Sequence, residues 1–286
     1  MAEIITEHLS HIYSADTPFE QVAIEDVNLR ISPGEFTAVI GHTGSGKSTF
    51  IQHLNALLQP SSGRVLLDGE DINRDKFARR DVKRKVGLVF QYPEYQLFEE
   101  TVYKDIAFGP GNMRLPAGEI DERVREAAAL TGVEEELFER SPLELSGGQK
   151  RRIAIAGVIA MRPEVLILDE PTAGLDPAGC ERVLNNIKNY HEKTGATVLI
   201  VSHSMDDVAR YAGRIIVFDG GHAVMDGTPG EVFSHTRELM EMGLNVPKAA
   251  QLAAALREKG VALPEGIFRH EELLAAILAR REGPAC

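Results

Sequence analysis

The chain has 286 residues, of which 43% are hydrophobic and 26% charged, and its formal net charge is −12. This length can bury one large core together with a small appendage. The acidic balance argues against a nucleic-acid partner, because phosphate backbones attract basic surfaces. No apolar run approaches the roughly 20 residues that cross a bilayer, and the first residues lack a signal-peptide pattern. The only cysteines, Cys180 and Cys286, are too few for a disulfide framework, which fits a reducing cytoplasm.

The first forty residues are predicted to form strands and turns, because apolar positions alternate and Ser32-Pro-Gly34 marks a turn. Tyr13 lies in this stretch, ahead of a glycine-rich loop. One interpretation of Tyr13 is an ordinary core residue. The other is a ring that stacks on adenine, which would contribute about 1–3 kcal/mol by analogy with other base–aromatic stacks.

A glycine-rich loop follows the short buried strand predicted at residues 36–40, and the spacing of Ile51, Leu54 and Leu58 predicts a helix after it. The loop matches G-x-x-x-x-G-K-[ST], the P-loop pattern, rather than a merely flexible Gly/Ser stretch. Lys47 is predicted to contact the β- and γ-phosphates of ATP, and Ser48 to ligate Mg²⁺. The candidate ATP-binding residues of the loop are Gly41, His42, Thr43, Gly44, Ser45, Gly46, Lys47, Ser48 and Thr49.

Two features lie between this loop and residue 93. A basic run from Lys76 to Lys85 is predicted to be a solvated surface segment, since it lacks the interleaved aromatic residues of a single-strand-binding platform. Gln91 follows a buried strand predicted at residues 86–90. It either closes the strand with hydrogen bonds or senses the γ-phosphate and Mg²⁺, because ligands bind at the carboxyl ends of such strands.

A helical pattern extends from about residue 93 to residue 160. Within it, Ser146 is predicted to cap a buried helix that carries two glycines at its start. Such a helix start offers a second anion-binding surface, although Ser-Gly-Gly alone is more often a plain turn. The candidate residues of this surface are Ser146, Gly147, Gly148 and Gln149.

The run at residues 165–168 has no polar position and predicts a strand buried on both faces of a parallel sheet. Asp169 and Glu170 follow it, and two buried acids need partners. We expect Asp169 to hold Mg²⁺ and Glu170 to take a proton from the attacking water. Asp176 lies in the next loop, and His203 follows a buried strand at residues 197–201. A lone histidine is usually structural, but one at this edge is a candidate γ-phosphate ligand.

In this order, these motifs make the chain resemble an ABC-type ATPase subunit over about residues 1–235, with the Leu145–Gln149 signature as the most specific element. The resemblance implies an α/β, P-loop NTPase ABC nucleotide-binding fold with an inserted helical subdomain and a small C-terminal helical segment. The corresponding divisions are residues 1–92 with 160–235 for the core, 93–159 for the helical subdomain, and 236–286 for a C-terminal dimerisation segment. It also implies catalytic roles for Lys47, Glu170 and His203, ATP contacts from Tyr13, Gln91 and Asp176, and metal ligation by Ser48, Gln91 and Asp169.

The resemblance further implies that two subunits enclose two ATP molecules, each held by the P-loop of one chain and by residues 146–149 of the other. The stretch from Phe90 to Val102, with Ala107 to Pro110, is similar to the second energising ATPase of energy-coupling factor (ECF) transporters. The partners implied are a sister ATPase subunit, a transmembrane coupling protein and a substrate-binding membrane protein. In the C-terminal segment, Ala249, Leu252, Ala253 and Leu256 predict the buried face of one short helix, and Leu273, Leu274, Ile277 and Leu278 mark another.

The resulting hypothesis is a Mg-dependent ATPase that energises an importer of a vitamin or metal-ion micronutrient from the cytoplasmic face of the cell membrane. The sister subunit is expected to be a different ATPase, although a homodimer is an open alternative. A rival hypothesis is a soluble ABC ATPase that acts on ribosomes or DNA. It is disfavoured because the chain lacks a second cassette, a long coiled-coil insertion and a basic balance. A regulatory module with weak hydrolysis is the other rival.

Overall fold

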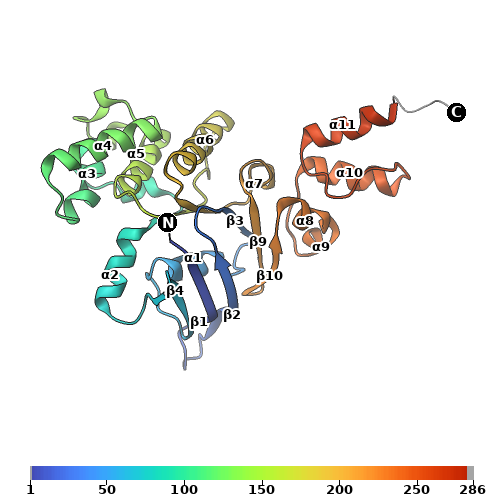
Figure 1. Ribbon diagram of the computed structural model, residues 1–286, viewed down its shortest axis with the longest axis horizontal. Helices are drawn as coiled ribbons and strands as arrows, with labels where there is room; N and C mark the ends of the chain where they lie inside the picture. The colour runs from blue at the N-terminus through green and yellow to red at the C-terminus, as the bar shows by residue number, and fades with distance from the viewer. Residues whose placement is uncertain (1, 282–286) are drawn as a thin grey trace.

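The structure is a computed structural model that describes residues 2–281 (Figure 1). Cys286 and the last residues of the segment expected at 236–286 lie outside the described residues. The described residues form two sheets, a group of helices at one end, and a pair of C-terminal helices at the other end (Figure 1).

The first sheet has four antiparallel strands in the order β2-β1-β4-β5. Their bounds are Ile4–Tyr13 for β1, Gln21–Ile31 for β2, Ser62–Leu67 for β4 and Glu70–Asp71 for β5. The inward side chains of these strands share one hydrophobic cluster with the helix α1 (Lys47–Leu54). The sheet therefore covers the helix that follows the P-loop and places Tyr13 beside it.

The second sheet has six strands in the order β10-β9-β3-β8-β7-β6. Their bounds are Phe36–Gly41 for β3, Val86–Val89 for β6, Val165–Asp169 for β7, Thr197–Val201 for β8, Arg214–Asp219 for β9 and His222–Gly227 for β10. All pairs are parallel except the β9–β10 hairpin, and β3, β7 and β8 are buried at every residue. Because parallel strands point the same way, the segments that follow β3, β6, β7 and β8 meet at one edge.

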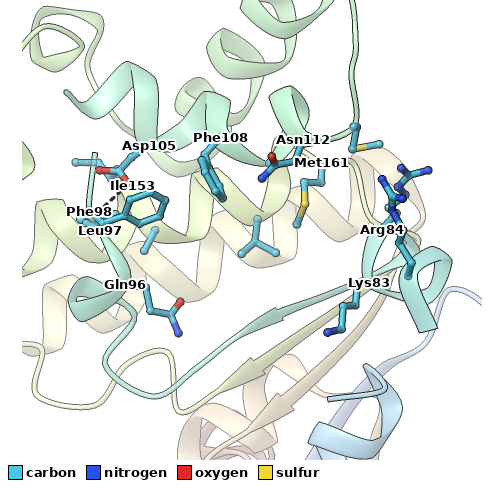
Figure 2. Close-up of a pocket in the computed structure, with 16 residues that line it drawn as sticks. Lys83, Arg84, Gln96, Leu97, Phe98, Asp105, Phe108, Asn112, Ile153 and Met161 are labelled. Carbon is cyan, nitrogen blue, oxygen red and sulfur yellow. Dashed lines mark hydrogen bonds between the residues drawn. The ribbon is translucent and has the colours of Figure 1, made fainter. Parts of the chain in front are cut away.

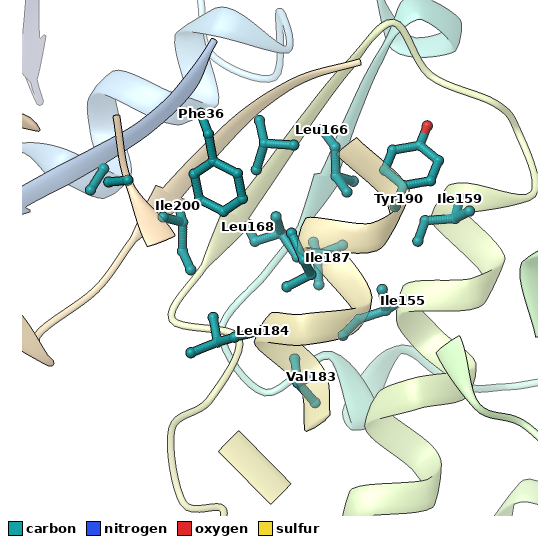
Figure 3. Packing of buried hydrophobic residues seen from close by; sticks show 14 of the residues in the cluster. Phe36, Ile155, Ile159, Leu166, Leu168, Val183, Leu184, Ile187, Tyr190 and Ile200 are labelled. Atoms are coloured by element: carbon teal, nitrogen blue, oxygen red, sulfur yellow. The ribbon is translucent and has the colours of Figure 1, made fainter. Parts of the chain in front are cut away.

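Helices cover this sheet and extend beyond it on one side. Their bounds are Lys76–Lys85 for α2, Pro93–Gln96 for the short η1, Val102–Asn112 for α3, Ala117–Thr131 for α4, Gly147–Ile159 for α5, Pro177–Thr194 for α6 and Met205–Tyr211 for α7; the 3₁₀ turns η2 (Glu135–Leu137) and η3 (Pro142–Glu144) link α4 to α5. Figure 3 shows Leu184 and Ile187 of α6 between the strands and Ile155 of α5, all in one buried cluster. Each such side chain contributes about 1.5–3 kcal/mol of burial free energy.

The C-terminal part consists of α8 (Pro229–Ser234), α9 (Thr236–Glu241), α10 (Lys248–Glu258) and α11 (His270–Arg281). The last two helices share a small cluster of their own, formed by Ala249, Ala253, Leu263, Ile267 and Leu273. The sequence pattern placed Leu252 on the same face as Ala249 and Ala253, but Leu252 is 51% exposed. The reason is that α10 fully buries only Ala249, Ala250 and Ala253, while Leu256 is partly buried and Leu252 lies outside this stripe.

Two local details complete the comparison with the sequence pattern. The helix α1 ends at Leu54 rather than continuing to Leu58, because Ala56 has a φ of 52°, which no α-helix contains. The basic run forms α2, whose N-terminus is capped by Asp75 and of which only Val82 is buried. In the described part of the chain, no helix is long and apolar enough to cross a membrane.

Candidate functional site

A cavity of about 470 Å³ lies at the edge where the parallel strands end. The P-loop, β1, β2 and the segments after β6, β7 and β8 all contribute to its wall. The lining residues are Tyr13, Gln21, Ala23, Thr43, Gly44, Gly46, Lys47, Ser48, Thr49, Gln91, Glu170 and His203. Most of the residues that the sequence predicts for the P-loop side of the site are therefore neighbours in space.

The conformation of the P-loop depends on glycine at particular positions. Gly46 has a φ of 103°, and a Cβ there would lie 2.7 Å from both Ala23 O and Ile24 Cγ2. The Lys47 ammonium donates to Gly41 O (2.7 Å) and His42 O (2.8 Å), so the loop wraps around its own lysine. Burial lowers the pKa of Lys47, while the charges of Glu170 and Asp169 act in the opposite direction.

The pair Ser48 and Asp169 offers oxygen ligands beside this lysine. Ser48 Oγ donates to Asp169 Oδ2 at 3.0 Å. Burial raises the pKa of Asp169, and the hydrogen bond from Ser48 partly opposes this shift. Among residues 2–281, no group of three or more His, Cys, Asp or Glu side chains could hold a metal by itself. A hydroxyl and a carboxylate that leave most positions to water and phosphate fit Mg²⁺, which binds proteins through few ligands.

The carboxylate of Glu170 is held from two sides. His203 Nε2 lies 2.7 Å from its Oε1, and Gln91 Nε2 donates to its Oε2 at 3.1 Å. The backbone of Glu170 has a φ of 48°, a conformation that non-glycine residues adopt rarely and that marks functional sites. The carboxylate of Glu170, after β7, is thus contacted by the residues that follow β6 and β8.

Tyr13 lines the cavity and is 39% exposed, which argues against an ordinary core role. Its hydroxyl shares a hydrogen bond with Thr49 Oγ1 (3.2 Å), and its ring meets His11 edge-on at 4.5 Å between centroids. His11 in turn contacts His53 of α1, which is fully buried. Neither histidine can be predicted to lie here from the sequence, because an isolated histidine in a strand or helix carries no pattern.

Three predicted P-loop residues, Gly41, His42 and Ser45, do not line the cavity. The His42 ring bonds to Asp219 Oδ1 at 3.0 Å, outside the cavity lining, so only its backbone remains for a phosphate. The Ser45 hydroxyl is fully buried within the loop, 3.4 Å from Lys47 Nζ. These side chains shape the loop rather than face the cavity.

The signature residues are not part of this cavity. Ser146 caps α5 and forms a reciprocal capping box with Gln149, as the sequence predicts for the helix start. A Cβ on Gly147 would meet nothing within 4 Å, and one on Gly148 would meet only Leu175 Cδ2 at 3.9 Å. Asp176 is also apart from the cavity and caps α6, where it accepts from Gly179 N at 2.8 Å. The chain therefore carries an open helix start that its own P-loop does not use.

A second cavity of about 570 Å³ lies between α2, residues 96–98, α3 and α5 (Figure 2). We call it the α2–α3 groove. Phe98 and Phe108 form part of its wall, are 64% and 45% exposed, and meet edge-to-face at 4.8 Å. Lys83 and Arg84 lie on its α2 side (Figure 2). The sequence resemblance covers residues 90–102 and 107–110, which include part of this wall, but it does not indicate the contributions of α2 and α5.

The two-sheet core, the phosphate-binding loop and the signature helix together define an ABC-type ATPase, an enzyme that binds and hydrolyses ATP. The family model described as ABC transporter matches residues 24–173. The chain is 53% identical over 273 residues to the "Energy-coupling factor transporter ATP-binding protein EcfA2" of Clostridium tetani, covering 95% of each chain. It is 52% identical over 280 residues to the protein of the same name from Caldanaerobacter subterraneus, covering 98% of each.

Solved structures agree with this assignment. The cbiO1 structure from Clostridium perfringens, described as part of the ABC transporter complex cbiONQ, has a TM-score of 0.75 and 39% identity, over 88% of this chain and 98% of that one. The ATP-binding cassette MJ0796, a dimer bound to ADP and Pi, has a TM-score of 0.71 and 28% identity, over 79% of this chain and 98% of that one. The chain belongs to the ABC transporter family and, within it, to the ATP-binding proteins of energy-coupling factor transporters.

Proposed function

We propose that this chain hydrolyses Mg·ATP to drive an ECF-type importer of a vitamin or metal-ion micronutrient, from the cytoplasmic face of the membrane. The observation that carries the proposal is the separation of the signature surface at residues 146–149 from the chain's own ATP cavity. An ATPase that is complete only across two subunits can convert binding into movement of one subunit against the other.

In this proposal each side chain around the cavity has a separate role in binding or hydrolysing ATP. Tyr13 stacks on the adenine, Lys47 holds the β- and γ-phosphates, and the residues that hold Mg²⁺ are Ser48, Asp169 and Gln91. The metal supplies charge neutralisation at the phosphates when it is bound. Glu170 accepts a proton from the attacking water, and His203, 2.7 Å from its Oε1, orients that carboxylate and contacts the γ-phosphate.

The second subunit supplies the other half of each site. Residues 146–149 and Asp176 of a sister ATPase would close over the phosphates held by this P-loop, and the reverse would hold at the other site. We assign residues 1–92 and 160–235 to the nucleotide-binding core, 93–159 to the signature subdomain and 236–286 to dimerisation. Exposure of Leu274 and Leu278 (58% and 45%) on α11 supports the last assignment, since a partner could cover them.

The α2–α3 groove is the surface proposed for the transmembrane coupling protein. Its aromatic wall is exposed, and it borders both the segment after Gln91 and the signature helix α5. An apolar segment of a membrane protein docked there would move when the two subunits close. A separate membrane protein would bind the micronutrient, so this chain would not contact it.

Co-purification tests the proposal directly. The tagged chain is recovered from gently solubilised native membranes, alongside Phe98→Asp and a matched control, Phe77→Asp. Phe77 is 79% exposed on α2 but does not line the groove. We expect wild type and the control to recover a second ATPase and a polytopic membrane protein, and Phe98→Asp to retain the ATPase but lose the membrane protein. Recovery only from the soluble fraction, alone or with ribosomes, would instead support the rival soluble ATPase.

A further inference from the structure

Arg151 is one of the largest fully buried side chains in the described part of the molecule, although it carries a charge. It lies in the second turn of α5, five residues after Ser146. Its Nη2 donates to both carboxylate oxygens of Glu94, at 3.0 and 3.1 Å, and its Nε donates to Oε2 at 3.2 Å. A buried guanidinium requires such a partner, because an uncompensated charge in the interior is costly.

The other side of the guanidinium binds the chain directly after Glu170. Arg151 Nη1 donates to Pro171 O at 3.3 Å and to Ala173 O. The same segment forms a turn, because Ala173 N donates to Glu170 O at 3.1 Å. Glu170 begins this turn in its left-handed conformation, which persists only where neighbouring contacts maintain it. The hydrogen bonds from Arg151 are contacts of this kind.

Glu94 lies on η1, three residues after Gln91, which donates to Glu170 Oε2. The segment from Gln91 to Glu94 therefore reaches Glu170 twice, once directly and once through Arg151. Neither Glu94 nor Arg151 lines the ATP cavity, so neither can contact the reacting atoms. We infer that Arg151 and Glu94 form a positioning pair for ATP hydrolysis, which fixes the turn that begins at Glu170.

A positioning role for Arg151 and Glu94 and a contribution to folding stability alone predict different effects of substitution. Glu94→Gln keeps the shape of the side chain but removes the charge that compensates Arg151. The guanidinium is then held less firmly against the carbonyl groups of Pro171 and Ala173. As a result, the carboxylate of Glu170 shifts relative to the attacking water. Small displacements of a catalytic group lower kcat, whereas the P-loop that sets ATP affinity is not touched.

The test is steady-state ATP hydrolysis by the full-length chain, purified from gently solubilised membranes together with the subunits that co-purify. We expect Glu94→Gln to lower kcat about tenfold with the KM for ATP within about twofold, since misplacement acts on the chemical step. Arg151→Lys should lose a similar amount, because an ammonium cannot form the forked contacts of a guanidinium. The matched control is Glu119→Gln on α4, whose partner Arg123 is 12% exposed and lies 2.6 Å away. Its kcat should be unchanged.

Two results would overturn the inference. One is an unchanged kcat in Glu94→Gln. The other is that the variant loses kcat and binding of a fluorescent ATP analogue to the same extent. That result would mean that Arg151 and Glu94 only support folding. Because every rate is compared within one type of preparation, the result does not depend on which membrane protein co-purifies. Failure of the proposed transport function would appear in the partner content, not in the rate ratio.

Discussion

Two helix starts in this molecule have the same backbone chemistry but different surroundings. The helix α1 begins after Gly46 with no side-chain cap, and Lys47, Ser48, Asp169 and Glu170 gather around it. The helix α5 begins at Gly147, is capped by its own Ser146 and has no acidic residue in its first turn. Both starts offer backbone amides and a partial positive charge. A phosphate site therefore needs more than a helix start, which fits the proposal that α5 completes a nucleotide site held by a sister subunit.

The largest expected effect is at Glu170, the acid beside the start of α1. Glu170→Gln removes the proposed proton acceptor but keeps the shape of the side chain, so turnover should fall roughly 10²- to 10⁴-fold. ATP binding should remain, because Lys47 and the loop amides are intact. Hydrolysis rates together with binding of a fluorescent ATP analogue measure both. Undiminished hydrolysis would contradict the role of Glu170 as general base.

The next effect separates the two helix starts by the same substitution. Gly46→Ala should abolish ATP binding, since its Cβ would lie 2.7 Å from Ala23 O and the φ of 103° is strained for alanine. Gly148→Ala has room within its own chain and should raise the free energy of unfolding by about 0.5 kcal/mol. It should nevertheless lower turnover roughly 10²-fold, because in the proposed dimer a methyl group would block amides that face the phosphates held by the sister subunit.

Mixed dimers provide the check on this pair of substitutions. With Gly148→Ala on one side only, the loss should fall on the ATP held by the other subunit's P-loop. If the loss fell on the nucleotide of the same chain, the two starts would belong to one site and the comparison would be wrong.

The last prediction concerns stability rather than turnover, and the end of α1 rather than its start. Burial lowers the pKa of His53 from 6.5 to about 4, so the folded chain keeps this ring neutral where the unfolded chain protonates it. The unfolded state then binds more protons between about pH 4 and 6.5, and stability should fall by up to about 3 kcal/mol as pH decreases through this window. Thermal unfolding against pH should show a shallower slope in His53→Gln, and equal slopes would contradict the assignment.

Much of the site could be predicted because it depends on local patterns. Buried parallel strands are continuous apolar runs, and the polar residue after each run must lie at the shared edge, which is where the structure places Gln91, Glu170 and His203. The role of Arg151 could not be predicted, because its partners Glu94 and Ala173 are distant in the sequence. Arg151 also lies in a short basic run, residues 150–152, and such runs usually mark a solvated surface. The exposure of Leu252 was also not predictable, since its apolar character fits a helix face whether or not anything covers it.

The small separate cluster of α10 and α11 affects which parts of the sequence can vary during evolution. Its members, such as Ala253 and Leu263, contact one another rather than the core beneath the ATP cavity. Substitutions at Ala253 or Leu263 should therefore be additive with substitutions around the ATP cavity, since distant sites without shared contacts act independently. The C-terminal helices, and with them the proposed contact to a sister subunit, can therefore change in sequence while the residues around the ATP cavity stay the same.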